Sequence, residues 1–100
     1  MELVNVKVFK LTTGEEVIAE LIKEEGGVHI CRKPFGVGVN QQGNLCFVPY
    51  MQYTNAVEEV HLSSQHVMVT ADPIDSIYND YMEATRKIFA PKKSIIRPVD

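Results

Sequence analysis

Apolar and polar side chains alternate along the first part of the chain with the two-residue period of a half-buried strand. Val4, Val6 and Val8 are separated by polar residues, and Thr12–Glu15 has the composition of a turn. This pattern predicts a hairpin from Val4 to Ile22. Both faces of its second arm carry apolar residues, which is typical of a strand that is covered on both sides or lies at an interface.

Short β-rich runs continue along the chain, and Gly, Pro, Ser and Asn residues between them predict turns. The run from Val28 is expected to end at Pro34, because proline cannot donate to a ladder. Gly36–Asn44 is expected to be a turn or flexible loop, although Val37 and Val39 could extend a strand. The first three strands should form a meander. For Val57–Leu62 an irregular strand is favoured over a turn of helix. The later strands are predicted at Val28–Arg32, Leu45–Val48, Val57–Leu62 and His66–Ala71.

A change of period after Ala71 predicts a helix. Asp72 is a suitable N-cap and Pro73 a suitable first helical residue. The helix should end before Pro91. A sheet over about 3–71, a helix over about 73–89 and a tail over 90–100 then make one domain, 1–100. The apolar stripe expected on this helix consists of Ile74, Ile77, Tyr78, Tyr81, Thr85 and Ile88.

Length and composition set the class of protein. A chain of 100 residues with 45% hydrophobic residues has the size and composition of one globular domain. A domain this small buries a limited share of its surface, so self-association is a plausible source of further burial. No secretory signal or membrane span is expected. Cys31 and Cys46 lack redox or metal spacing and are expected to be buried thiols in a reducing cytoplasm.

Candidate catalytic chemistry is sparse. His29, His61 and His66 lack the spacing of metal ligands, and His29 is expected to face solvent from a strand. His61 and His66 flank a predicted polar turn and could lie together. Neighbouring glutamates on a strand point to opposite faces, and no nucleotide-binding glycine motif is present. We therefore expect a protein that is not an enzyme and that has no cofactor or metal.

The formal net charge of −3 argues against a protein that coats nucleic acid by bulk electrostatics. Half of the basic residues lie near the C-terminus, where they fit a solvated helix end better than a phosphate-binding patch. Tyr50 and Tyr53 could stack on bases or anchor a protein partner, and packing in the core is an equal alternative. Phe47 is expected to pack. The basic C-terminal residues are Arg86, Lys87, Lys92, Lys93 and Arg97.

Several motifs resemble those of Sm and Sm-like proteins. The segment Val6-x-Val8-x-x-Leu11-x-x-Gly14-x-x-Val17-x-Ala19-x-Leu21, followed by a Val28–Cys31 strand, resembles their first conserved segment. The resemblance is closer to the small Sm-like proteins of tailed phages, particularly cyanophages, and covers most of the chain. The motifs shared with that group are Thr13-Gly14-Glu15-Glu16-Val17, Lys33-Pro34, Phe47-Val48-Pro49-Tyr50-Met51-x-Tyr53-Thr54 and the Val67–Pro73 junction.

The resemblance implies a mainly β fold: a strongly bent five-stranded antiparallel sheet that forms a small open barrel, here with a C-terminal helix. It also implies a toroidal homo-oligomer in which sheet edges pair between subunits. Family members usually carry their helix before the sheet. We expect the edges of the first hairpin and of the last strand to pair between subunits in this chain.

The resemblance further implies RNA binding by loops around a central pore. This chain has Glu24–Gly27 and Ser63–His66 at those loops and lacks the family's Arg-Gly pair. RNA contacts are expected from the second loop, and Tyr50 and Tyr53 are candidates for base stacking or for binding a partner. The expected function is a non-enzymatic ring that is RNA-binding or RNA-chaperone-like. The alternative is a structural or regulatory assembly ring that binds proteins, and either would be cytoplasmic (host cytoplasm if phage-encoded), without membrane contact. The candidate RNA-binding residues are Ser64, Gln65 and His66.

Overall fold

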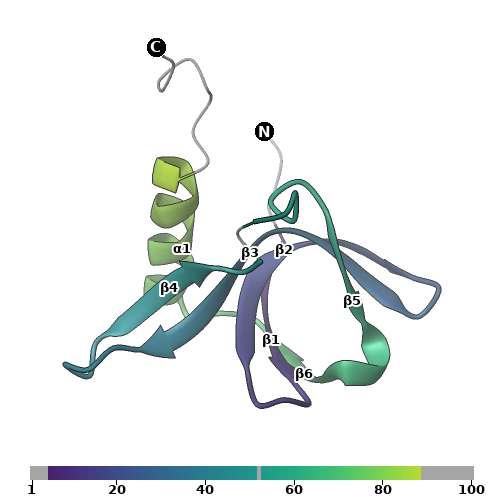
Figure 1. The fold of residues 1–100 in the computed structure, drawn as a ribbon, viewed down its shortest axis with the longest axis horizontal. Coiled ribbons are helices and arrows are strands. Elements are labelled where there is room, and N and C mark those ends of the chain that lie inside the picture. Colours follow the sequence, from purple (N-terminus) through teal and green to yellow (C-terminus); the bar gives the residue numbers. More distant parts are fainter. Residues whose placement is uncertain (1–4, 52, 89–100) are drawn as a thin grey trace, which may run out of the picture.

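The computed structural model describes residues 5–51 and 53–88. Within these residues the chain is mainly β, with one antiparallel sheet and one C-terminal helix, as predicted (Figure 1). None of the helices in the described ranges is long and apolar enough to cross a membrane. The elements are β1 (Val6–Leu11), β2 (Glu16–Glu25), β3 (Val28–Val39), β4 (Leu45–Pro49), β5 (Val60–Ser63), the 3₁₀ turn η1 (Ser64–His66), β6 (Val67–Ala71) and α1 (Asp75–Ile88).

The strands form an open sheet in the order β4-β3-β2-β1-β6, and β5 lies off this path and pairs with β3. The predicted meander of the first three strands is confirmed, because β1, β2 and β3 are antiparallel neighbours. The sheet has six strands, whereas the resemblance implied five. The extra strand arises because β3 has two partners on one side: Val28–Cys31 pairs with β5, and Phe35–Val39 pairs with β4.

The prediction that the third strand ends at Pro34 is wrong, because β3 continues to Val39. Pro34 lies between the part of β3 that pairs with β5 and the part that pairs with β4. The register with β2 also shifts close to this point, and Lys33 has a φ of 55°. Proline is tolerated at such an irregularity because the ladder is already interrupted there. The alternative in which Val37 and Val39 extend a strand is the one that the structure has.

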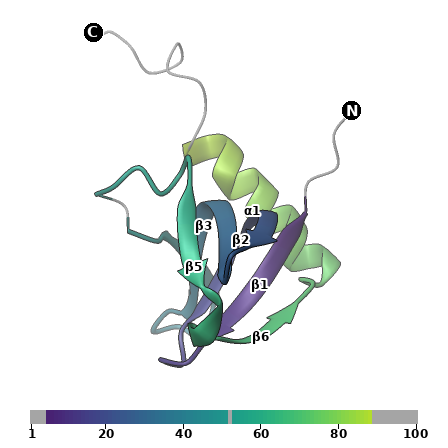
Figure 2. The same cartoon turned by 90° about the vertical axis from the view of Figure 1, so that its right-hand side faces the viewer.

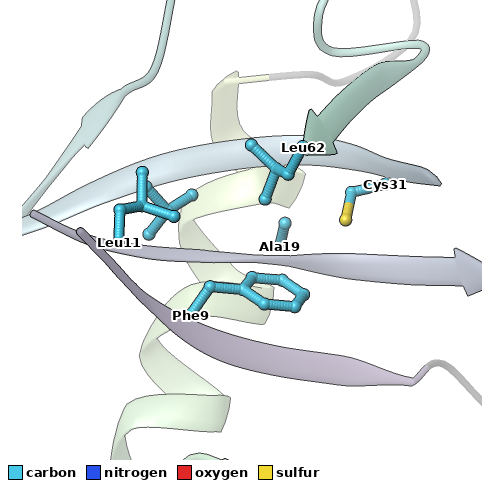
Figure 3. Packing of buried hydrophobic residues seen from close by; sticks show 6 residues of the cluster. Phe9, Leu11, Ala19, Cys31 and Leu62 are labelled. Carbon is cyan, nitrogen blue, oxygen red and sulfur yellow. The ribbon is translucent and has the colours of Figure 1, made fainter. Parts of the chain in front are cut away.

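Two hydrophobic clusters lie on opposite faces of the first hairpin. The first cluster, shown in Figure 3, is enclosed by the curved sheet and β5. The second contains Val6, Ile18, Phe35 and Tyr81, so it joins the sheet to α1. Neighbouring residues of β2 enter different clusters, which confirms that this strand is covered on both sides. The first cluster consists of Phe9, Leu11, Val17, Ala19, Cys31 and Leu62.

The helix begins at Asp75, two residues later than predicted. The Tyr78 N–H donates to the Ile74 carbonyl over 2.9 Å, so Ile74 supplies the first acceptor of the helix. Asp72 does not cap it, because the Asp72 carboxylate binds the Lys7 ammonium. The interpretation of Asp72 as N-cap and Pro73 as first helical residue is therefore wrong.

The apolar stripe of α1 faces the second cluster. Tyr81 and Thr85 are buried, and Ile77 and Tyr78 pack beside them. Ile74 was predicted to belong to this stripe but is 69% exposed, because it precedes the first helical residue. The side chain of Ile88, Val4 at the predicted start of the hairpin and the tail over 90–100 lie outside the described residues.

Candidate functional site

The residues predicted to contact RNA form η1, the connection between β5 and β6. The Ser64 N–H donates to the Gly27 carbonyl over 2.9 Å, and the Thr12 N–H donates to the His66 carbonyl over 2.9 Å. Gly27 and Thr12 belong to the turns at opposite ends of β2, so η1 connects both turns across the concave side of the sheet (Figure 1). A connection of three residues can do this only because the sheet is strongly curved. The structure thus places two predicted loops together.

His29 is buried beneath η1, which corrects the prediction that it faces solvent. Its Nδ1 lies 3.0 Å from Ser64 Oγ, its Nε2 lies 3.4 Å from a carboxylate oxygen of Glu24, and its ring packs edge-on against Phe9. The first part of β3 lies between β2 and β5, so alternate side chains point into the first cluster. Cys31 shares this face because it lies two residues further along the strand.

Ser64, His29 and Glu24 follow one another in the order of a Ser-His-acid triad. A catalytic serine also needs a substrate cavity and N–H donors for an oxyanion. The Ser64 N–H is already bonded to Gly27, and the pocket that the structure shows beside β5 is lined by other residues. We therefore interpret this network as structural: it fastens the β2–β3 turn to η1.

The exposed part of η1 consists of Gln65 and His66. His66 Nδ1 lies 3.3 Å from Thr12 Oγ1, so its ring rests against the first turn. His61 contacts Glu59, with 2.6 Å between Nε2 and Oε2. The two histidines that flank the turn thus have different partners. Of the three predicted RNA-contacting residues, Ser64 uses its hydroxyl on His29, and the other two are exposed.

Tyr50 and Tyr53 have different environments. Tyr50 is half-buried against the first cluster, and burial together with the Glu15 carboxylate raises the pKa of its phenol above the usual value. Tyr53 is 92% exposed. Phe47 packs edge-on against Phe35, with 6.3 Å between ring centroids, as expected for a packing residue. Tyr53 thus remains available for a partner, whereas Tyr50 contributes to the core.

The basic residues of the strands are engaged by carboxylates. A nucleic-acid surface needs a local excess of positive charge to displace counterions from phosphate. Around η1, Glu24 and Glu25 are exposed, and Glu25 pairs with Lys23. Among the described residues, no group of three or more His, Cys, Asp or Glu side chains could hold a metal ion. The ion pairs of the strand cations are Lys7–Asp72, Lys10–Glu16, Lys23–Glu25, Arg32–Glu20 and Lys33–Glu20.

A pocket of about 590 Å³ lies beside β5, within the segment that joins β4 to β5. Sequence reasoning did not find this site. Its two glutamates, Glu58 and Glu59, are neighbours in sequence, and nothing in their spacing indicates that the chain folds back around them. The pocket is lined by Met51, Thr54, Asn55, Ala56, Glu58, Glu59, Val60 and His61.

A scan against models of known protein families and a search of curated proteins find no match to this chain. The Sm-like resemblance therefore stays a prediction. The function has to be inferred from the sheet edges, the charges and the exposed side chains described above.

Proposed function

We propose that this chain is the subunit of a non-enzymatic, Sm-like ring that assembles through the edges of its sheet. The observation that carries the proposal is the pair of open edges at the two ends of the sheet. Within the described residues, β6 pairs with β1 alone and β4 pairs with β3 alone, so each leaves one row of backbone groups without a strand partner. Each of these strands is five residues long.

The side chains on these edges support assembly. Leu45 and Val48 on β4 are 44% and 54% exposed, and Met68 and Val69 on β6 are 60% and 52% exposed. Exposed apolar edge strands are prone to uncontrolled pairing. If β4 of one subunit pairs with β6 of the next, both edges are covered. A head-to-tail contact of this kind closes into a ring when the rotation between neighbouring subunits brings the last subunit back to the first.

The edge of the first hairpin has a different role from the one predicted. The outer side of β1 pairs with β6 of the same chain from Val8 to Leu11, so the prediction that this hairpin pairs between subunits is wrong. Strand β6 covers that edge, so the outer side of β6 is the edge that remains for pairing with another subunit. The other end of the sheet is provided by β4, which the sequence did not single out as an interface.

The charges favour a protein partner for the ring over RNA. Carboxylates already engage the cations of the strands, and Glu24 and Glu25 lie on the turn beside η1. The exposed Tyr53, which lies outside the edge strands, has the character of a protein-binding residue. RNA is the second candidate. It is supported by Gln65 and His66, which are exposed beside the two turns that η1 joins.

Two measurements test this function. Size-exclusion chromatography with light scattering should give a mass several times that of the 11.3 kDa chain at micromolar concentration. Fluorescence anisotropy with short U-rich and A-rich RNAs should show little binding at low salt. An anisotropy increase that weakens as salt is raised would instead establish contacts to the phosphate backbone and favour the RNA alternative.

A further inference from the structure

Hydrogen bonds hold the chain that lines the pocket beside β5. The Thr54 hydroxyl donates to the Met51 carbonyl over 2.7 Å and accepts from the Ala56 N–H over 3.1 Å. The Glu58 N–H donates to the Asn55 carbonyl over 2.9 Å, and Ala56 is 3% exposed. The volume of about 590 Å³ is within the usual range for pockets that bind ligands. The pocket is therefore a formed feature of the β4–β5 segment.

The pocket is lined by both acidic and apolar residues. Met51, Ala56 and Val60 contribute apolar surface, and Glu58 and Glu59 contribute carboxylates. Glu59 pairs with His61, but in the described part of the chain the exposed Glu58 carboxylate has neither an ion pair nor a hydrogen bond. An occupant with a cation next to a branched apolar side chain would match both kinds of lining residue.

We propose that this pocket binds the C-terminal segment of the same chain, residues 92–97. This segment has the sequence Lys-Lys-Ser-Ile-Ile-Arg, so basic residues flank two isoleucines. The strand cations are already engaged by carboxylates, whereas Glu58 has no ion pair among the residues that the structure describes. The charge and the apolar content of the segment are complementary to the acidic and apolar residues that line the pocket.

The position of α1 makes this contact reachable. The C-terminal end of α1, which ends at Ile88, lies at the same end of the molecule as the start of β5 (Figure 2). An extended chain covers about 3.3 Å per residue, so Lys92 can reach about 13 Å from Ile88 and Arg97 about 30 Å. A short tether gives an effective concentration in the millimolar range, so a weak intrinsic affinity is enough to occupy the pocket.

Carbodiimide cross-linking of the full chain tests the proposal, because this reagent joins a carboxylate to an amine that touches it. Mass spectrometry should find Glu58 or Glu59 linked to Lys92 or Lys93. The link should disappear in Glu58→Gln/Glu59→Gln. The matched control Asp75→Asn/Asp80→Asn removes two exposed helix carboxylates and should leave the link intact. Absence of the link, or its loss in the control variant, would overturn the proposal.

A mixture of ¹⁴N- and ¹⁵N-labelled chains separates contacts within a chain from contacts between chains. Links confined to one isotope are expected, and links that join the two isotopes in statistical proportion would refute docking within the same chain.

Trypsin gives an independent readout. If the segment is docked nine-tenths of the time, cleavage after Lys92 and Lys93 should be about tenfold slower than in Glu58→Gln/Glu59→Gln. Equal rates would contradict docking. Neither readout depends on ring assembly.

Discussion

Ser64 is the residue that keeps the buried His29 ring bonded. Its hydroxyl lies 3.0 Å from His29 Nδ1. Ser64→Ala would leave that nitrogen buried without a partner, which costs about 1–3 kcal/mol. The free energy of unfolding, measured by urea denaturation, should fall by this amount. Ser63→Ala is the matched control, since Ser63 is exposed and makes no capping bond. Equal losses in both variants would show that the hydroxyl of Ser64 has no special role.

The two cysteines should differ in reactivity. Cys31 is fully buried, and burial raises the pKa of its thiol from 9.0 to about 12, whereas Cys46 is half-buried. Because the thiolate is the reactive form, iodoacetamide at pH 8 should alkylate Cys46 and spare Cys31. Mass spectrometry of digested samples at successive times measures both rates. Similar rates would mean that the first cluster opens readily.

The buried Cys31 thiol also predicts a dependence of stability on pH. The pKa is raised in the folded state, so the contribution of the neutral thiol to stability is complete below about pH 9. That contribution should be lost as the pH rises from 9 toward 12. Cys31→Ala should show a smaller loss of stability over this interval in denaturation experiments.

His29 illustrates what the sequence could have predicted at the scale of single residues. Cys31 was expected to be buried, and His29 lies two positions earlier on the same face of β3, so the strand period already placed it in the core. The partner on η1 could not be predicted. Ser64 is 35 residues further along the chain, and curvature of the sheet brings it over His29.

At the scale of elements, Tyr81 anchors α1 to the sheet. Its hydroxyl donates to the Lys33 carbonyl over 2.6 Å, at the point where β3 changes partners. Tyr81→Phe should lower the free energy of unfolding by about 1–3 kcal/mol, because the carbonyl loses its donor in a buried site. Tyr78→Phe serves as the control, since Tyr78 is half-buried on the same helix and its hydroxyl has no bond in the described part. Chemical denaturation compares the two, and similar effects would contradict the anchor.

The Tyr81 phenol should also make the chain less stable in strong alkali. Burial, and then the Glu20 carboxylate, raise its pKa above the usual value of 10.0. The stabilising contribution of the neutral phenol is therefore complete below pH 10 and declines as the pH rises further. In Tyr81→Phe this decline should be smaller, which a denaturation series between pH 8 and 11 measures.

Local patterns predicted the strands and the helix well, but they predicted element ends less well. Pro34 and Asp72 have strong local preferences for ending a strand and capping a helix. Both are overridden by contacts distant in sequence: β3 passes through Pro34 because its partners change there, and Asp72 binds Lys7. Likewise, the pocket beside β5 depends on the conformation of the β4–β5 segment, which no periodicity in the sequence predicts.

For the whole molecule, the most important feature is the pair of open edges at the two ends of the sheet. A single chain leaves apolar residues exposed on β4 and β6, and one contact between these strands covers both edges in every subunit of a closed ring. The patterning of the chain predicted β6 as an interface because it is a last strand with apolar residues. It could not predict β4, since the pairing of β3 with two strands follows from the bend at Lys33–Pro34.

Hydrogen exchange of the β4 and β6 amides tests this pairing most directly. In an edge strand, roughly half of the amides face the neighbouring strand, and the others point outward. At high protein concentration, peptides covering Leu45–Pro49 and Val67–Ala71 should show slow exchange both for the amides that face the neighbouring strand and for those that point outward. The outward half should lose protection on dilution or in Val69→Lys, but not in the control Ile74→Lys, which changes an exposed residue outside the strands. If the outward half exchanges as fast as the same amides of the unfolded chain at every concentration, the edges do not pair and the proposed ring is contradicted.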